Sequence, residues 1–244
     1  MEKGQLIFNL KNIETYDPED FYISKSNFNV STLLKSPQDW FNRSAVIFGQ
    51  KKSGKTHLLN IWSGYNNANL INCLDVQSWN DISFNTNIAI DDFHNLKDEE
   101  GFFHFYNSLI LEKKTILVTV DINSNFEIKL KDLNSRFKSF TSSKIENPED
   151  DLLKAIIMKY FSNAQVQVDK NVIEYLLKRV DRDYQKLYDI LEKINILSLQ
   201  RKSKITTHLI RDIMTQPNSQ KLLNVDHFYF YLFLILPVYF YLLL

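Results

Sequence analysis

The sequence Gly49-Gln50-Lys51-Lys52-Ser53-Gly54-Lys55-Thr56 decides the expected fold of this chain. It follows the apolar run 45–48 and leads into the apolar-patterned segment 57–62. A strand, a glycine-bounded loop and a helix in this order predict a phosphate-binding loop of the form G-x-x-x-x-G-K-[ST]. The chain has only five glycines, and two of them stand at this spacing, so the match is specific. We therefore predict that the chain binds a nucleotide or descends from a protein that did.

Each residue type in the loop has a physical task. Gly49 and Gly54 let the backbone curl until its N–H groups point at phosphate oxygens, and the following helix directs its positive end at the same anion. Lys55 is expected to reach the β- and γ-phosphates, and the Thr56 hydroxyl to coordinate Mg²⁺. The expected nucleotide contacts in this stretch are Gly49, Gln50, Lys51, Lys52, Ser53, Gly54, Lys55, Thr56 and His57.

Composition limits the classes of protein to consider. A length of 244 residues suits one large domain, or one domain with a small partner, and 44% hydrophobic residues suffice for a core. The 29 basic residues balance the 29 acidic ones, so no overall field draws the chain to nucleic acid or anionic lipid. The single cysteine, Cys73, permits no internal disulfide and fits a reducing cytosol.

Two further strand ends carry polar residues suited to a nucleotide site. Segments 69–74, 87–92 and 115–121 are predicted to be buried strands, and the second ends in Asp91 and Asp92. Without the phosphate loop, two aspartates opening a loop would be an ordinary feature. With it, Asp91 is expected to bind Mg²⁺ and Asp92 to polarise the attacking water. Thr119 or Asp121, near the end of the third strand, is expected to sense the γ-phosphate.

The pattern changes from α/β to all-helical near residue 147. Up to Ile145 strands and helices alternate, as in a doubly wound parallel sheet with helices on both faces. Asn147 then reads as a helix N-cap, with Pro148 at the first helical position. Four helices are predicted to follow, over 148–163, 169–181, 183–201 and 206–215, with Asp169 and Thr206 as further caps.

The two ends of the chain are distinctive. Gln5-Leu6-Ile7-Phe8-Asn9-Leu10 is interpretable either as an edge strand or as a docking peptide with a hydrogen-bonding glutamine and apolar anchors. Residues 228–244 carry no charge, yet the run is short for a membrane span and contains Pro237. No basic residue follows it, so we favour sequence never selected for folding over a membrane anchor.

Taken in order, the phosphate loop, the Asp91-Asp92 strand end, the Ser135-Arg136-Phe137 helix and the helical lid resemble the AAA+ ATPases. The loop and Ile90-Asp91-Asp92 are similar to those of the DnaA-related group. Phe21-Tyr22-Ile23 would by itself be ordinary core or an adenine slot. It resembles that group's adenine-side motif, which implies base contacts from Tyr22 and Ile23.

The layout resembles most closely the Hda-type regulatory inactivators of DnaA, of the alphaproteobacterial kind. These proteins open with a clamp-binding peptide, which Gln5, Leu6, Phe8 and Leu10 fit, and they lack the DNA-binding domain of DnaA. The resemblance implies the domains 1–12 (clamp-binding peptide), 13–147 (AAA+ α/β domain) and 148–216 (lid), with the apolar tail 217–244 outside the pattern.

The resemblance implies a negative regulator of chromosomal replication initiation. Arg136 matches the arginine finger, which acts in trans on ATP bound to DnaA once the protein is tethered to the DNA polymerase sliding clamp. The protein's own site would hold ADP or ATP with Mg²⁺ and hydrolyse it weakly or not at all. The lid arginine of the family falls near Gln185, which carries no charge, so either Arg182 substitutes for it or the site holds nucleotide weakly.

The same resemblance implies a cytoplasmic, replisome- or nucleoid-associated protein that meets DNA only through the clamp and is able to form homo-oligomers. Two other classes stay open. A DnaA-like ATPase or helicase loader would bind DNA directly. The balanced charge of the chain argues against direct DNA binding. A small-molecule kinase would also have a phosphate loop. The helical lid and the Ser-Arg-Phe helix argue against a kinase.

Overall fold

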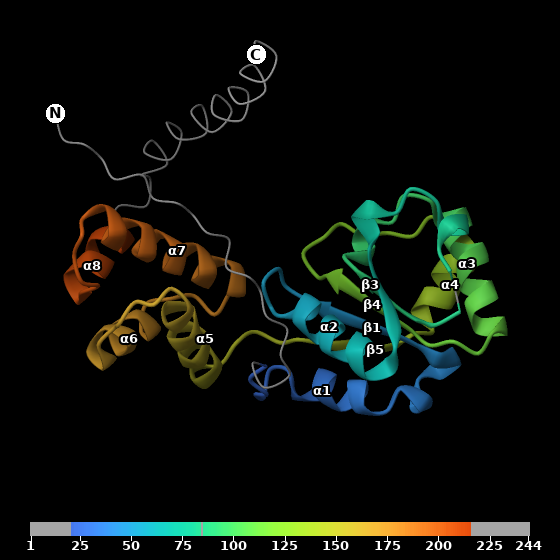
Figure 1. The fold of residues 1–244 in the computed structure, drawn as a ribbon, viewed down its shortest axis with the longest axis horizontal. Coiled ribbons are helices and arrows are strands. Elements are labelled where there is room, and N and C mark those ends of the chain that lie inside the picture. Colours follow the sequence, from blue (N-terminus) through green and yellow to red (C-terminus); the bar gives the residue numbers. More distant parts are fainter. Residues whose placement is uncertain (1–20, 84, 216–244) are drawn as a thin grey trace, which may run out of the picture.

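The computed structural model describes residues 21–83 and 85–215. Within these ranges an α/β domain is followed by a smaller helical domain (Figure 1). The expected clamp-binding residues Gln5, Leu6, Phe8 and Leu10 lie outside the described residues, and so does the apolar tail 217–244.

A five-stranded parallel sheet forms the centre of the α/β domain. Its strand order is β2-β3-β4-β1-β5, so β4 lies between β3 and β1. The phosphate-binding loop follows the strand β1 directly. The strands are β1 (Ser44–Gly49), β2 (Ala68–Asn72), β3 (Asn87–Asp91), β4 (Ile116–Asp121) and β5 (Thr141–Lys144).

Helices cover both faces of the sheet, which confirms the predicted doubly wound arrangement (Figure 1). Ala45 and Ile47 of β1 point to the face of α1 and α2, whereas Val46 between them points to the face of α3. This alternation follows from the two-residue period of a strand, and each fully buried aliphatic side chain contributes about 1.5–3 kcal/mol. The helices of this domain are α1 (Phe28–Lys35), α2 (Lys55–Asn66), α3 (Glu99–Leu111) and α4 (Lys131–Lys138).

The strand predicted over 69–74 is present as β2, but the prediction that it is buried is wrong. The strand β2 ends at Asn72, and Asn69 and Leu70 are exposed, with 39% of the Leu70 surface accessible. The reason is the position of β2 at the edge of the sheet, where only β3 pairs with it. An apolar run does not by itself distinguish a central strand from an edge strand.

The prediction that Asn147 caps the first lid helix is also wrong, because α5 begins at Asp150 and Glu149 holds the cap position. The Asn147 side chain instead accepts a hydrogen bond from Gln50 Nε2 at 3.2 Å, which ties the interdomain linker to the phosphate loop. Asp169 stands at the predicted cap position of α6 without a side-chain cap bond. Thr206 does accept a bond from the Leu209 amide before α8.

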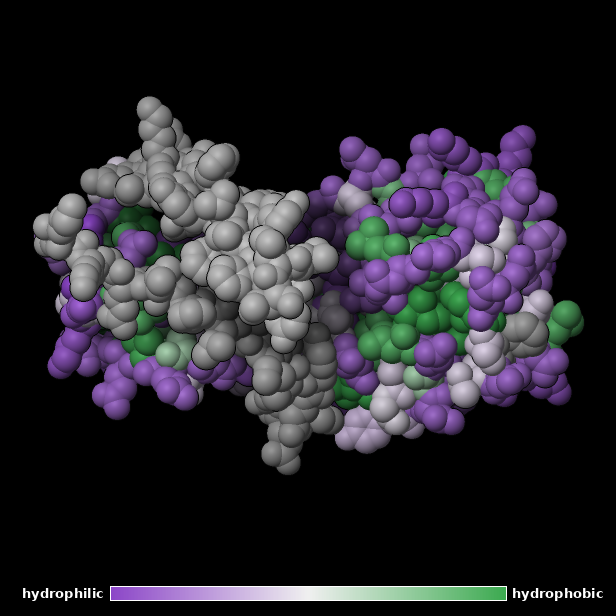
Figure 2. Space-filling view, turned by 45° about the horizontal axis from the view of Figure 1, so that its top comes forward, coloured by the Kyte–Doolittle hydropathy of each residue, from purple (hydrophilic) through white to green (hydrophobic). Residues whose placement is uncertain are grey.

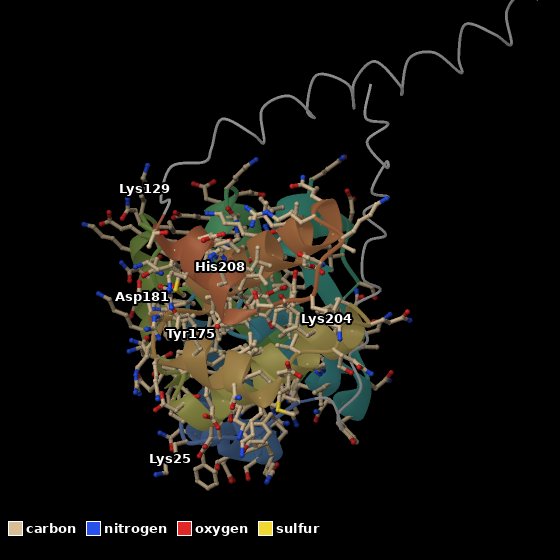
Figure 3. All side chains as sticks on the ribbon, turned by 90° about the vertical axis from the view of Figure 1, so that its left-hand side faces the viewer. Lys25, Lys129, Tyr175, Asp181, Lys204 and His208 are labelled. Carbon is tan, nitrogen blue, oxygen red and sulfur yellow. The ribbon has the colours of Figure 1, made fainter. Side chains whose placement is uncertain are left out.

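The helical domain has an apolar core of its own. Residues such as Ile157, Leu176, Leu187 and Leu191 are almost fully buried in it. Polar side chains, among them Lys204 and His208, lie on its outer side (Figure 3). The four helices are α5 (Asp150–Asn163), α6 (Lys170–Leu177), α7 (Tyr184–Gln200) and α8 (Thr207–Thr215).

The visible surface of the α/β domain is mostly hydrophilic, with an apolar area among the polar side chains (Figure 2). Within the described parts of the chain, no helix has the length and apolar character needed to cross a membrane.

Leu187→Ala should destabilise the protein by about 2–5 kcal/mol, because it opens a cavity where the side chain is 0% exposed. Leu199→Ala on the same helix, where the side chain is 46% exposed, should cost less than about 1 kcal/mol. Urea unfolding followed by circular dichroism measures both. Equal losses would contradict the assignment of Leu187 to the lid core.

Candidate functional site

The phosphate loop is a tight turn that depends on its two glycines. Gly54 has a φ of +92°, a left-handed conformation that side chains rarely adopt, and it precedes the first residue of α2. At Gly49 an added Cβ would lie 2.6 Å from Ser53 Oγ and 3.3 Å from Ile145 Cβ. A side chain at position 49 would therefore have to displace the Ser53 hydroxyl and crowd the Ile145 side chain.

Lys55 lies inside the loop as a buried cation. Its Nζ donates hydrogen bonds to the carbonyl oxygens of Gly49 at 3.0 Å and Gln50 at 2.8 Å, and the residue is only 6% exposed. Burial lowers the pKa of Lys55, while the carboxylates of Asp121, Asp92 and Asp91 act in the opposite direction. This lysine thus stands among three acidic groups contributed by two neighbouring strands.

Asp91, at the end of β3, is the residue that joins the loop helix to the sheet. Thr56 Oγ1 donates a hydrogen bond to Asp91 Oδ2 at 2.6 Å, and Thr119 Oγ1 donates one to Asp91 Oδ1. The two predicted Mg²⁺ ligands, Thr56 and Asp91, therefore lie in direct contact. Carboxylate and hydroxyl oxygens are suitable Mg²⁺ ligands.

Asp92 ends the strand with a sharp change of direction. Its φ of +52° is left-handed, which costs a residue with a side chain about 1 kcal/mol or more. Burial, followed by the neighbouring Asp91, raises the pKa of Asp92, with opposing effects from His94 and Lys55. The Nδ1 atom of His94 lies 4.0 Å from Asp92 Oδ1.

Of the two predicted γ-phosphate sensors, Thr119 is fully buried and hydrogen-bonded to Asp91. Asp121 stands at the end of β4 in register with Gly49, beside the start of the loop. Its amide donates to His94 Nδ1 at 3.4 Å. The hydrogen bond that His94 accepts from Asp121 and the bond from Thr119 to Asp91 were not predicted. The sequence signal that points to His94 is its position two residues after the paired aspartates.

The loop has polar groups that fit a phosphate. Gln50 Oε1 and Ser53 Oγ are buried with no hydrogen-bond partner among the described residues. The first N–H groups of α2 also lack acceptors within the helix, as at any helix start. Buried polar atoms without partners are costly, and they are common where a ligand supplies the missing bonds. The Ser53 hydroxyl and the first amides of α2 can donate to the phosphates of a nucleotide, whereas Gln50 Oε1 can only accept a hydrogen bond.

The expected base-side residues Tyr22 and Ile23 are each 51% exposed. The turn that carries them is held by Asn27, whose side chain accepts from the Ser24 amide at 2.8 Å and donates to the Tyr22 carbonyl at 2.9 Å. Phe21 packs beside the start of α2, with its ring centroid 5.4 Å from that of His57. This segment therefore borders the loop.

The lid approaches the loop through α7. Lys52 Nζ lies 6.0 Å from the ring centroid of Tyr188. The expected substitute for the lid arginine, Arg182, pairs with Asp150 at 2.9 Å, both on the lid. Gln185 Nε2 donates to Asp189 Oδ1 at 2.7 Å. The nucleotide role of Arg182 stays a prediction.

Arg136 is exposed on α4 and forms no ion pair with another described residue. Its carbonyl accepts hydrogen bonds from the Ser139 amide at 3.0 Å and the Ser139 hydroxyl at 2.6 Å. These bonds close the last turn of α4, which ends at Lys138, so the exposed Arg136 lies in that last turn.

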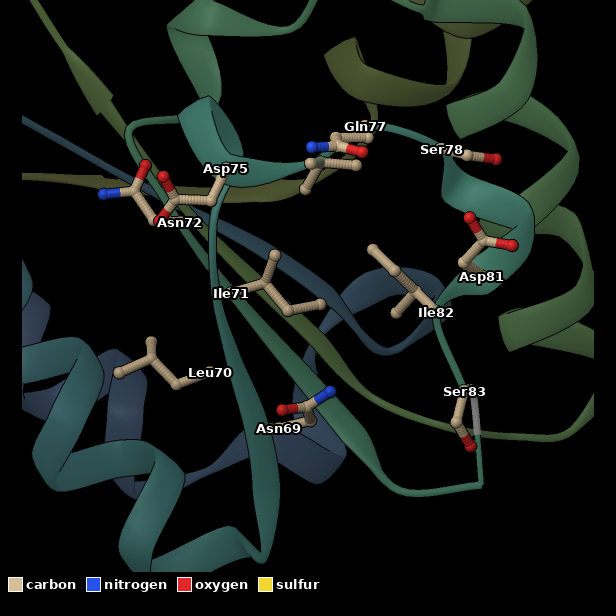
Figure 4. Close-up of a pocket in the computed structure, with 11 residues that line it drawn as sticks. Asn69, Leu70, Ile71, Asn72, Asp75, Gln77, Ser78, Asp81, Ile82 and Ser83 are labelled. Carbon is tan, nitrogen blue, oxygen red and sulfur yellow. The ribbon is translucent and has the colours of Figure 1, made fainter.

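A separate hollow of about 460 Å³ lies along the edge strand β2 (Figure 4). Ile71 and Ile82 line it from opposite sides, with polar residues such as Asn69 and Asp81 around them. None of the phosphate-loop residues 49–56 contributes to its lining. It is therefore distinct from the nucleotide site.

Asp92→Asn should raise the melting temperature at pH 7. The folded state raises the pKa of this carboxyl, so ionisation of Asp92 opposes folding at neutral pH. The difference from wild type should shrink as the pH falls toward about 4, where the carboxyl is protonated in the unfolded chain as well. Thermal melts between pH 4 and 7 measure this, and a gap that widens on acidification would contradict the electrostatic interpretation.

Comparison with known proteins supports this organisation. Residues 151–214 match the family described as "Hda, lid domain". The replication initiator DnaA of Buchnera aphidicola is 25% identical over 91% of this chain and 59% of its own length. The chain spans 49% of another DnaA, from Nautilia profundicola, so it covers about half to three-fifths of such relatives.

Solved structures show the same fold. Domain III of Thermotoga maritima DnaA aligns with a TM-score of 0.62 and 20% identity, over 80% of this chain and 93% of that one. AMPPCP-bound DnaA from Aquifex aeolicus aligns with a TM-score of 0.58 and 20% identity, over 78% of this chain and 71% of that one. The α/β domain with its phosphate loop therefore shares the fold of these DnaA structures, and the helical domain that follows it is similar to the Hda lid domain.

Proposed function

We propose that this protein is a regulatory inactivator of DnaA. In this proposal it docks on the DNA polymerase sliding clamp and stimulates hydrolysis of the ATP bound to DnaA. The observation that carries the proposal is Arg136, an exposed arginine without an ion pair among the described residues, at the end of a helix of a DnaA-related domain. The Hda-type lid supports the choice of this branch of the family.

The protein's own site would hold ADP or ATP with Mg²⁺. Loop amides and Lys55 would bind the phosphates, Thr56 and Asp91 would hold the metal ion, and Tyr22 with Ile23 would border the base. Bound Mg²⁺ supplies charge neutralisation at the phosphates. The AMPPCP complex of the Aquifex aeolicus relative supports a nucleotide of this class.

This site is proposed to order the fold rather than to turn over its nucleotide. Gln185, at the position expected for a lid arginine, is uncharged and bonded to Asp189, while Arg182 is paired with Asp150. Neither residue supplies an unpaired cation to the phosphates. Asp92 would polarise water if hydrolysis occurred, and its raised pKa makes it a better base than an exposed aspartate.

The catalytic step is assigned to Arg136 acting in trans. A guanidinium placed against a transferring γ-phosphoryl group stabilises the charge that develops on its oxygens. Such an arginine accelerates hydrolysis by about 10³–10⁵-fold in GTPases that receive it from a second protein. The exposure of Arg136 in the last turn of α4 supports this assignment, since a finger acting in trans has to reach a second protein.

Arg136→Ala should abolish stimulation of DnaA-bound ATP hydrolysis, measured as conversion of labelled ATP to ADP on DnaA with clamp loaded on DNA. Lys138→Ala is the matched control, since it removes an exposed cation two residues further along the same helix end. The control should keep stimulation within about twofold. Equal activity of wild type and Arg136→Ala would refute the finger assignment.

The tether has its own test in the same assay. Gln5→Ala combined with Leu6→Ala should remove both clamp capture and stimulation, because the glutamine and the apolar anchors would provide the docking contacts. A surplus of soluble DnaA should not restore stimulation to the wild-type level. Clamp capture that survives the double substitution would exclude the peptide as the tether.

A second candidate, a DnaA-like ATPase acting directly on DNA, is favoured by the DnaA relatives themselves. It predicts tight, salt-sensitive DNA binding without the clamp. The balanced charge of the chain, with 29 basic and 29 acidic residues, favours the first proposal.

A further inference from the structure

A stacked pair of aromatic rings connects the nucleotide site to the helix of Arg136. Phe93 follows Asp92 directly, is 0% exposed, and lies in the aromatic cluster between the sheet and α3. Its ring centroid is 5.5 Å from that of Phe137, with the ring planes 20° apart. Phe137 is the neighbour of Arg136 in α4.

The Phe93 end of this pair is fixed by the nucleotide site. The Asp92 amide donates to Asp91 Oδ1 and to Thr119 Oγ1, both at 3.1 Å. The left-handed Asp92 then turns the chain into a short helical turn, closed by a bond from the Asn95 amide to the Asp92 carbonyl at 2.9 Å. The direction of the Phe93 ring therefore depends on how the Asp91-Asp92 strand end is held.

The Phe137 end controls only the last part of α4. The start of that helix is anchored separately, since the Glu99 carboxylate accepts bonds from the Lys129 amide at 3.1 Å and the Leu130 amide at 2.6 Å. Near the arginine, Phe137 also contacts Phe126 at 5.7 Å and Phe140 at 5.3 Å between centroids. Of these contacts, the one with Phe93 leads directly to the nucleotide site, and Phe126 packs on Phe93 as well, at 5.7 Å between centroids.

We propose that Phe93 is a positioning residue for Arg136. In this inference, which rests on the proposed function, the strand end that faces the protein's own nucleotide sets the position of the finger through the Phe93–Phe137 stack. Aromatic cores are packed to high density, so a shift of one ring displaces its neighbour instead of being absorbed. A misplacement of about 1 Å can cost a catalytic group about 100-fold in rate.

Phe93→Leu tests the link because it keeps an apolar side chain and removes the stacking ring. The expected result is at least a tenfold loss of maximal stimulation of DnaA-bound ATP hydrolysis. The concentration for half-maximal stimulation should stay within about twofold. Phe137→Leu should reproduce this loss and serves as the second variant if Phe93→Leu folds poorly.

Phe105→Leu is the matched control. Phe105 is buried in the same cluster, but its ring contacts within the described ranges are with Trp79 and Phe102. Phe105→Leu should lower the melting temperature about as much as Phe93→Leu does. It should keep the stimulation of DnaA-bound ATP hydrolysis within about twofold of wild type. In addition, Phe93→Leu combined with Arg136→Ala should be no slower than Arg136→Ala alone, since both changes act on one group.

A measurement without DnaA separates the two proposals. A fluorophore on Lys138→Cys reports on the end of α4, and the one native cysteine should not compete. Cys73 is buried, and burial raises the pKa of its thiol to about 12, so it holds little thiolate. Mg²⁺-ADP should change the emission, and Phe93→Leu should abolish the change while ADP affinity by calorimetry stays within about threefold.

The outcomes are distinguishable. If Arg136→Ala retains stimulation, the proposed function fails, and the fluorophore alone decides the link. If Arg136→Ala is inactive but Phe93→Leu behaves like Phe105→Leu, the link is overturned and the proposed function stands. An emission change that persists in Phe93→Leu also overturns the link.

Discussion

The rest of this site depends on the buried carboxylate of Asp91. It accepts hydrogen bonds from Thr56 on α2, from Thr119 on β4 and from the amide of Asp92. A buried charge needs such partners, because an uncompensated carboxylate in the interior is strongly unfavourable. Meeting this requirement brings the phosphate-loop helix, two central strands and the turn toward Phe93 into one arrangement.

A second constraint holds the lid against the α/β domain. Tyr184, the first residue of α7, is 2% exposed and packs in the core cluster of α1 and α2. Burial raises the pKa of its hydroxyl to about 12, so the hydroxyl stays protonated and donates to the Glu146 carbonyl at 3.2 Å. Because Glu149 accepts from the Lys25 amide at 3.1 Å, the same junction positions the segment that carries Tyr22 and Ile23.

The fold was largely predictable from the sequence, because glycine spacing and apolar runs report conformational preferences of neighbouring residues. The glycine spacing at 49 and 54 requires a tight turn, and Gly54 does adopt a left-handed φ. The predictions for the edge strand β2 and for Asn147 were wrong because strand order and the Gln50–Asn147 bond are long-range. Burial of Asp91 by Thr119 was missed for the same reason, as the two residues are 28 positions apart.

The sequence by itself determined the phosphate loop, the paired aspartates at a strand end and the α/β-to-helical boundary, whereas Arg136 was selected through the family resemblance alone. The loop, the strand end and the boundary are each encoded within a few consecutive residues. There the allowed backbone conformations and the spacing of apolar residues restrict the chain to one type of local structure. Only the tertiary structure decided that Thr119 binds Asp91, that Arg182 pairs with Asp150, and that Phe93 stacks on Phe137. Such contacts join residues whose separation along the chain carries no signal, because strand order and helix packing bring them together.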